Sequence, residues 1–218
     1  MLLKQRNNDL GKLVDGIWTD DQPSAPSRGG KFVRQDSQFR NWITPDGQPS
    51  ISGDGGFPAQ SGRYHLYVSY ACPWAHRTLI FRQLKGLQDH VGVSVVNPFA
   101  GDHGWSFDAD RTGVAGDHLY GLKYLYQIYQ KSDPLVSSRV SVPVLWDKHR
   151  GVIVSNESSE IIRMFNTAFD GITGNSDEYW PKAMRNKIEA INEPIYSNFN
   201  NGVYKSGFAR TQSAYDQA

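Results

Sequence analysis

Residues 64–77 have the sequence YHLYVSYACPWAHR. The first half is rich in aromatic and β-branched residues that partly alternate with others, which predicts a strand over Tyr64–Ser69. Pro73 suits the first turn of a helix, because its missing N–H would have no partner there. An apolar pattern of helical spacing continues from it, and Gly86 predicts the end of that helix. The one cysteine of the chain, Cys72, therefore lies where a strand passes into a helix.

Strand and helix patterns alternate through the residues that follow. A buried strand is predicted at 91–96, and the long, polar, glycine-rich stretch at 98–117 predicts a functional loop. The remaining elements are expected at 118–131 (helix), 140–146 and 152–154 (strands), 157–169 (helix) and from Pro181 towards Asn200 (helix). The resulting order from residue 62, β-α-β-loop-α-β-β-α, predicts an α/β fold with a compact sheet.

The first 60 residues contrast with this pattern. Clusters of Gly, Pro, Ser and Asp at 20–30 and 50–56 break any regular element, so we expect residues 1–60 to form a long irregular arm. Disordered segments rarely carry many aromatic residues, so the aromatic residues of this arm predict that it is anchored to a folded body. These anchors are Trp18, Phe32, Phe39, Trp42 and Phe57.

The overall composition excludes several kinds of partner and location. The chain has 218 residues, enough for one large or two modest domains, and its 23 basic and 22 acidic residues give a net charge of +1. No basic stripe is present, which argues against nucleic acid as a partner. The apolar runs are too short to span a bilayer, and Met1–Asn8 lacks the apolar core of an export signal. A single cysteine without an export signal predicts a reducing, cytoplasmic location.

Cys72 is the first candidate for chemistry. The N–H groups and the dipole at a helix start favour the thiolate, which lowers the thiol pKa and creates a nucleophile. A buried, inert cysteine is the structural alternative, and the strand–Cys–Pro–helix setting favours the reactive interpretation. A single cysteine cannot form an internal disulfide, so redox chemistry needs a second sulfur from a small thiol such as glutathione.

Two further motifs leave alternatives open. Pro143 lies inside an apolar run, where it is either an edge-strand proline or a cis proline that turns backbone groups towards an extended peptide. Ser155 to Ser158 lie between a strand and a helix, and capping of that helix accounts for them. Alternatively, the N–H groups and the Ser158 hydroxyl bind a carboxylate while Glu157 accepts an ammonium; a γ-glutamyl group presents both.

Five motifs in a fixed order carry a family resemblance. They are CPWA at 72–75, GWSF at 104–107, RVSVPVLWD at 139–147, SNES at 155–158 and NGVYKSGFA at 201–209. Together they resemble the glutathionyl-hydroquinone reductases, the Xi class of glutathione transferases, from near residue 15 to the end of the chain. Cys-Pro-x-Ala and Glu-Ser are shared with other transferases, whereas the long arm and the motifs at 104–107 and 201–209 are typical of this class.

The resemblance implies an architecture and a glutathione site. A thioredoxin-like domain at 61–172 would be followed by the beginning of an all-helical domain at 178–218. Cys72 would be the nucleophile, and Tyr204 would donate a proton near the quinone; the structural alternative for Tyr204 is a helix-packing aromatic residue. Pro143 would be a cis proline that exposes the Val142 backbone to the cysteinyl part of glutathione. The implied glutathione-binding residues are Trp105, Arg139, Val140, Ser141, Val142, Pro143, Glu157 and Ser158.

The implied reaction has two steps. The Cys72 thiolate attacks the glutathionyl sulfur of a glutathionyl-hydroquinone, and the hydroquinone leaves with a proton from Tyr204. A second glutathione attacks the resulting mixed disulfide, releases oxidised glutathione and restores the thiol. Glutathione is thus a co-substrate, and no metal is implied. Two alternatives stay open: a broader thiol transferase or dehydroascorbate reductase, and a non-catalytic glutathione-binding module.

The end of the chain departs from the family pattern. Family members continue through several more helices beyond the position of Ala218, and those helices carry further tyrosines of the hydroquinone pocket and the homodimer interface. We therefore expect an incomplete helical domain with an exposed apolar face, and hence low stability or non-native self-association. We also expect glutathione binding to be retained better than turnover.

Overall fold

The structure is a computed structural model that describes residues 11–20 and 27–218. The described residues fall into two compact units, the first containing 11–20 and 37–177, the second 27–36 and 178–218. The N-terminal arm therefore contributes to both units, and the predicted division at residues 60 and 172 stays a prediction. The predictions for residues 1–10, including the missing export signal, and for most of the cluster at 20–30 lie outside the described residues.

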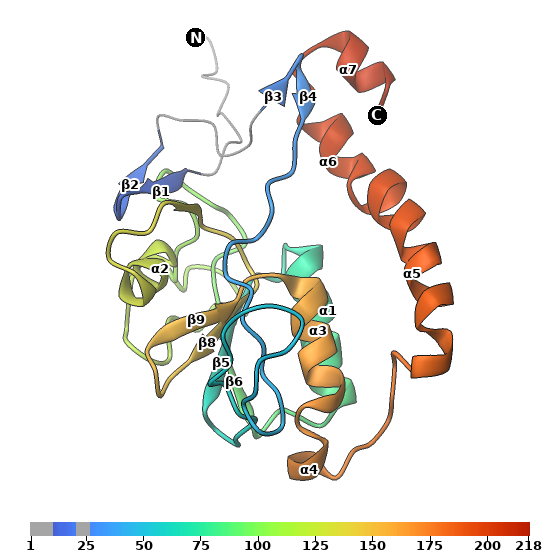
Figure 1. Cartoon of the computed structure of the whole chain (residues 1–218). Coiled ribbons are helices and arrows are strands. Elements are labelled where there is room, and N and C mark those ends of the chain that lie inside the picture. Colours follow the sequence, from blue (N-terminus) through green and yellow to red (C-terminus); the bar gives the residue numbers. More distant parts are fainter. Residues whose placement is uncertain (1–10, 21–26) are drawn as a thin grey trace. The chain divides into compact units, whose positions relative to one another are not determined.

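A four-stranded mixed sheet forms the centre of the first unit (Figure 1). β5 (Tyr64–Val68) pairs in parallel with β6 (Val91–Val95). On its other side β5 pairs antiparallel with β8 (Val144–Asp147), which pairs antiparallel with β9 (Val152–Ser155). Since β5 and β9 are both antiparallel to β8, they run in the same direction, and their carboxyl ends lie at the same edge of the sheet.

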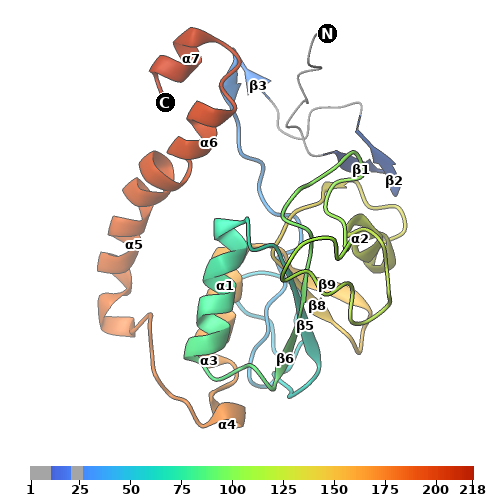
Figure 2. The same ribbon diagram turned by 180° about the vertical axis from the view of Figure 1, so that it is seen from behind.

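Helices cover both faces of this sheet. α1 (Pro73–Leu84) and α3 (Ser158–Thr167) pack against each other on one face, and α2 (Tyr126–Ser132) lies on the other (Figures 1 and 2). The short α4 (Asp170–Thr173) follows α3. Within the central sheet and its helices, the order β5-α1-β6-α2-β8-β9-α3 confirms the predicted α/β class and the predicted sequence of elements.

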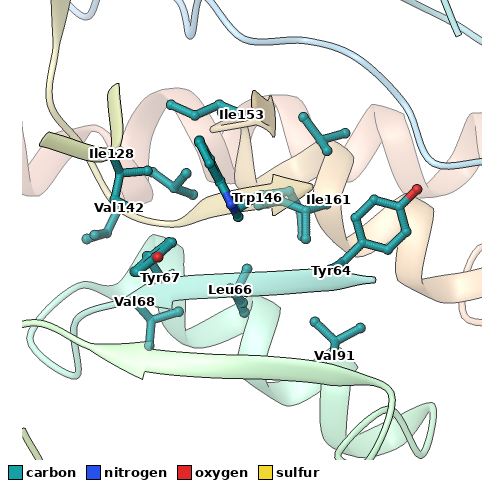
Figure 3. Packing of buried hydrophobic residues seen from close by; sticks show 14 of the residues in the cluster. Tyr64, Leu66, Tyr67, Val68, Val91, Ile128, Val142, Trp146, Ile153 and Ile161 are labelled. Carbon is teal, nitrogen blue, oxygen red and sulfur yellow. The ribbon is translucent and has the colours of Figure 1, made fainter. Parts of the chain in front are cut away.

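The core of the first unit lies between the sheet and its helices (Figure 3). Every residue of β5 and β8 is buried, as expected for strands that are covered on both faces. Trp146 is fully buried, and its indole N–H donates to the Tyr120 hydroxyl (3.0 Å). Arg63 is buried against Asp147, with its Nε 3.0 Å from Oδ1, so the charge of each side chain is compensated.

The predicted helix at 118–131 is wrong in its first half, because α2 begins only at Tyr126. The carboxylate of Asp117 accepts hydrogen bonds from the N–H groups of Leu119 and Leu122 (both 3.1 Å), which organises a local turn. Such side-chain bonds compete with a helix for the same backbone groups. Gly121 then adopts a left-handed conformation (φ +63°), which ends the turn.

The predicted strand at 140–146 is also wrong in its first half. Residues 140–143 belong to no strand: a separate strand, β7 (Ser138–Arg139), ends before them, and β8 begins only at Val144. A proline has no N–H to donate to a central ladder, which accounts for the break. The Val142–Pro143 bond is cis, which decides between the two alternatives for this proline.

The arm is more regular than its composition predicts. β1 (Lys12–Val14) and β2 (Ile17–Thr19) form a hairpin, and β1 also pairs antiparallel with β7. The two-residue turn consists of Asp15 and Gly16, both with positive φ (49° and 75°), which is the Asp-Gly turn typical of tight hairpins. The prediction of an irregular arm is therefore wrong for this segment.

Four of the five predicted aromatic anchors are confirmed, whereas Phe32 belongs to the second unit, where it stacks on Tyr204 and Phe208. Trp42 and Phe57 are buried in the core, while Trp18 and Phe39 pack against it. The Trp18 indole N–H also donates to the Asp102 carbonyl (3.1 Å), which ties the arm to the long loop.

The second unit combines part of the arm with the C-terminal helices. Its elements are β3 (Ser27–Arg28), β4 (Lys31–Phe32), the 3₁₀ turn η1 (Lys182–Met184), α5 (Arg185–Pro194), the π-helical η2 (Ile195–Asn200), α6 (Gly202–Gly207) and α7 (Gln212–Asp216). The predicted helix from Pro181 towards Asn200 is confirmed. No helix of the described part of the chain is both long enough and apolar enough to cross a membrane.

Candidate active site

Four segments of the first unit meet at one edge of the central sheet. The carboxyl ends of β5 and β9 lead directly to Cys72 and Glu157, at the starts of α1 and α3. β6 runs parallel to β5, so the loop that carries Trp105 also leaves from this edge, and the antiparallel β8 begins here after Pro143. The carboxyl edge of an open α/β sheet is where such folds bind their ligands.

Cys72 is the N-cap residue of α1. Its backbone is extended (φ −101°, ψ 113°), Pro73 occupies the first turn, and no side-chain hydrogen bond caps the helix. The side chain is half-buried, and its Sγ lies 3.6 Å from the Val142 carbonyl oxygen. The sulfur thus occupies the place where helices commonly carry a capping oxygen.

Glu157 is the N-cap residue of α3, and here the side chain does cap the helix. Its Oε1 accepts hydrogen bonds from the Ser159 N–H (3.0 Å) and the Ser159 hydroxyl (2.8 Å). Its Oε2 accepts a hydrogen bond from the Ser37 hydroxyl (2.9 Å), which comes from the arm. Ser158, the first residue of α3, is buried. Capping by Glu157 itself, rather than by Ser155 or Asn156, differs from the prediction.

Arg77 joins the two helix starts. Its Nε and Nη2 lie 3.0 and 2.7 Å from the Ser158 hydroxyl oxygen, which accepts both hydrogen bonds, and its Nη2 lies 3.8 Å from Glu157 Oε1. The guanidinium also stacks over the Trp74 ring at 5.0 Å. The sequence places Arg77 five residues after Cys72 and gives no sign of its partners on α3, so this link is visible only in the structure.

The pKa of Glu157 reflects opposing influences. Burial raises it, because a charged carboxylate loses hydration. The hydrogen bonds from Ser159 and Ser37 and the charge of Arg77 lower it further than burial raises it, so the pKa of Glu157 lies below its ordinary value of 4.5. The site therefore holds a carboxylate that is charged at neutral pH, at a helix start that favours negative charge.

The loop between Arg139 and Pro143 is held by a buried tyrosine. The Tyr129 hydroxyl donates to the Ser141 carbonyl (2.9 Å) and accepts from the Ser141 N–H (3.1 Å) and the Asn156 side chain (3.3 Å). Burial raises the pKa of Tyr129, so the phenol stays neutral. One hydroxyl thus connects the loop beside Cys72 with the residue before Glu157, a role that the sequence does not reveal.

The other predicted glutathione-binding residues lie on neighbouring segments. Val140 and Val142 are buried, and Arg139 belongs to β7, where it pairs with Lys12 of the arm. The indole Nε1 of Trp105 is buried and has no hydrogen-bond acceptor among the described residues. Since buried donors are nearly always paired, this nitrogen has the capacity to donate to a ligand.

Tyr204 belongs to the second unit. The Arg34 guanidinium lies 4.4 Å above its ring centroid, and the rings of Phe32 and Phe208 stack against it at 5.9 and 6.1 Å. The Arg34 Nε also donates to Asn201 Oδ1 (2.5 Å), which fixes the guanidinium. The predicted proton-donating role of Tyr204 stays a prediction. Across residues 11–20 and 27–218, no group of three or more His, Cys, Asp or Glu side chains could hold a metal ion.

Comparisons with known proteins find similar sequences around this site. The family model of the glutathione S-transferase N-terminal domain matches residues 71–168, which include α1, the cis proline and the start of α3. Residues 71–168 therefore match the glutathione S-transferase N-terminal domain, and the central domain of the chain is thioredoxin-like, as the resemblance implied.

As a whole, the chain is similar to glutathionyl-hydroquinone reductases and to Xi-class glutathione transferases. It is 56% identical, over 96% of its own length, to the glutathionyl-hydroquinone reductase YqjG of Escherichia coli. The glutathione-bound structure of YqjG covers 95% of the chain with a TM-score of 0.85 and 53% identity. The glutathione transferase Xi of Phanerochaete chrysosporium covers 85% with a TM-score of 0.79 and 49% identity. The chain spans 64% of the curated YqjG sequence and 61% of each solved chain.

Proposed function

We propose that this chain binds glutathione at the edge of the sheet and uses Cys72 to reduce glutathionyl-hydroquinones to hydroquinones. The observation that carries the proposal is the bridge from Arg77 to Ser158 and Glu157. It joins the helix that starts at the cysteine to the helix start that would hold a γ-glutamyl group. The relative at 56% identity is named glutathionyl-hydroquinone reductase, and a structure of it is described as glutathione-bound.

Each part of glutathione has a partner in this proposal. The charged Glu157 accepts the ammonium of the γ-glutamyl group, and the N–H groups at the start of α3, with the Ser158 hydroxyl, bind its carboxylate. The Val142 backbone pairs with the cysteinyl part of glutathione. Its carbonyl oxygen lies 3.6 Å from Cys72 Sγ. Trp105 donates its unpaired indole N–H to the ligand. The remaining contacts come from Arg139, Val140, Ser141 and Pro143.

The proposed reaction begins at the sulfur of the conjugate. The Cys72 thiolate attacks the glutathionyl sulfur, the bond between that sulfur and the aromatic carbon breaks, and its electron pair stays with the carbon. Tyr204 supplies the proton that this carbon takes up, so a free hydroquinone leaves. Cys72 and glutathione are now joined in a mixed disulfide.

A second glutathione completes the cycle. Its thiolate attacks the glutathionyl sulfur of the mixed disulfide, so oxidised glutathione leaves and the Cys72 thiolate is restored. The hydroquinone carbon has gained the two electrons that the two glutathione sulfurs lost. Because the cycle needs reduced glutathione, we place it in the cytoplasm.

Turnover of a defined conjugate tests this proposal. With glutathionyl-menadiol and excess glutathione, the wild-type chain should release menadiol and oxidised glutathione in equal amounts, measured by liquid chromatography. Cys72→Ser should release neither. Turnover of dehydroascorbate or a small mixed disulfide without the conjugate would favour a broader thiol transferase instead. Glutathione binding without any turnover would show that the chain is a non-catalytic glutathione-binding module.

A further inference from the structure

A segment of the N-terminal arm, residues 37–43, lies along the free edge of β9 and the start of α3. The Asn41 N–H donates to the Val154 carbonyl (2.9 Å), and the Asn156 N–H donates to the Phe39 carbonyl (3.1 Å). At its far end Ile43 is buried, with its N–H 3.0 Å from the Met164 sulfur. The segment is therefore fixed against the element that leads into Glu157, as an added edge to the sheet.

Ser37 stands where this segment reaches the proposed site. Its hydroxyl oxygen lies 2.9 Å from Glu157 Oε2 and 3.3 Å from the Asn156 carbonyl oxygen. A hydroxyl has one proton to donate, and the shorter bond to a charged oxygen is the stronger of the two. The Ser37 proton is therefore donated to the carboxylate.

The two oxygens of Glu157 have different partners. Oε1 is held by the N–H and the hydroxyl of Ser159, its near neighbour on the same helix, and also lies 3.8 Å from Arg77 Nη2. Oε2 is held by Ser37, 120 residues away in the chain. The terminal torsion of a glutamate has a broad energy minimum, so one fixed oxygen alone leaves the plane of the carboxylate free to turn. The Ser37 bond fixes the second oxygen and with it the plane.

We propose that Ser37 is a positioning residue of the γ-glutamyl site, orienting the Glu157 carboxylate towards the ammonium of glutathione. This inference rests on the proposed function. Without the Ser37 hydroxyl, Glu157 keeps its charge and its bonds to Ser159 but loses its fixed orientation. Loss of the Ser37 hydroxyl should therefore lower the affinity only for ligands that carry the ammonium group.

A pair of ligands that differ in this one group tests the inference. The first is S-methylglutathione, whose blocked sulfur prevents disulfide exchange, and the second is its analogue with a glutaryl group in place of the γ-glutamyl group. Isothermal titration calorimetry measures the affinity of each. Ser37→Ala should lower the affinity for S-methylglutathione by about three- to tenfold, which corresponds to the loss of one hydrogen bond. It should leave the affinity for the glutaryl analogue unchanged.

Two further variants control for structural effects. Ser37→Thr keeps the hydroxyl and should restore wild-type affinity for S-methylglutathione. Ser61→Ala removes a comparable hydroxyl bond, to His90 (2.8 Å), beside the opposite end of β5, and should change neither affinity. Equal weakening of both ligands by Ser37→Ala, or no change in either, would overturn the positioning role. Failure of the wild-type chain to bind S-methylglutathione at all would instead overturn the proposed function, and this inference with it.

Discussion

The starts of α1 and α3 share one backbone geometry and differ in what caps them. The N-cap residue has φ −101° and ψ 113° at Cys72, and φ −101° and ψ 107° at Glu157. Glu157 caps its own helix through Ser159, whereas Cys72 makes no side-chain capping bond. The fold thus places two helix starts of nearly identical backbone geometry side by side, with different side chains at their N-cap positions. In the proposed function, Glu157 at the start of α3 binds the ligand ammonium, and Cys72 at the start of α1 supplies the reactive sulfur.

The two starts are also coupled. Arg77 of α1 bonds Ser158 of α3, and the Tyr129 hydroxyl connects Ser141 with Asn156 behind them. A substitution at one helix start should therefore leave the other helix start unaffected only when these hydrogen bonds stay intact.

Removal of the charge at the start of α3 should have the largest effect. Glu157→Gln keeps the shape and an oxygen for the Ser159 N–H, but loses the charge that attracts the ligand ammonium. A hydrogen bond to a charged group contributes about 1.5–3 kcal/mol, so glutathione affinity should fall about 10- to 100-fold. Calorimetric titration measures this, with Glu193→Gln on exposed α5 as the control. Equal affinity of Glu157→Gln and wild type would contradict the ammonium site.

Removal of the Tyr129 hydroxyl should have the second-largest effect. Tyr129→Phe leaves the Ser141 backbone and the Asn156 side chain without their buried partner. The free energy of unfolding should fall by about 1–3 kcal/mol, as expected for unsatisfied buried groups. Urea unfolding measures the change, and Tyr70→Phe, at an exposed tyrosine, should leave the midpoint in place. An unchanged urea midpoint for Tyr129→Phe would show that the hydrogen bonds of this hydroxyl do not stabilise the folded chain.

The contribution of Glu157 to stability should depend on pH in a defined direction. Its pKa is lowered by folding, so its charge stabilises the folded chain above the ordinary value of 4.5. That contribution is lost as the pH falls through the lowered pKa. The difference in unfolding free energy between wild type and Glu157→Gln should thus be constant near neutrality and shrink in acid. Denaturation at stepwise lower pH measures it, and a difference that grows in acid would contradict the lowered pKa.

The smallest effect is expected from a substitution at Cys72, at the start of α1. Here the free energy of unfolding should rise instead of falling. Serine is a preferred N-cap residue, so Cys72→Ser should supply the missing cap and raise the free energy of unfolding by about 0.5–1 kcal/mol. The variant should be more stable and inactive at once. Cys72→Ala, which offers no capping oxygen, is the matched control and should show no gain. Equal stability of the serine and alanine variants would mean that this helix start gains nothing from a cap.

Most of the fold could be predicted because its signals are local. Pro73 and Gly86 bracket α1, and the structure places the helix at Pro73–Leu84. Where the predictions are wrong, a local interaction overrides the periodic pattern. The Asp15-Gly16 turn defines a hairpin whose strands are too short to show alternation, and the Asp117 carboxylate organises a turn where apolar spacing alone predicts a helix.

The site could be predicted only in part, since its partners are distant in sequence. Residue types and helix starts identify Cys72 and Glu157. The residues that position them are invisible in a pattern, because Ser37 lies 120 residues from Glu157 and Arg77 lies 81 residues from Ser158. A serine in a Gly- and Ser-rich arm and an arginine on a helix carry no local signal of such contacts.

The central claim is that the sulfur at the uncapped helix start exchanges partners with glutathione. Intact-mass spectrometry tests it in a single turnover, with glutathionyl-menadiol added and no free glutathione present. The account predicts that the wild-type chain gains the mass of one glutathionyl unit, loses it when glutathione is added, and that Cys72→Ser gains nothing. An unmodified wild-type chain, or an adduct that persists in Cys72→Ser, would contradict it.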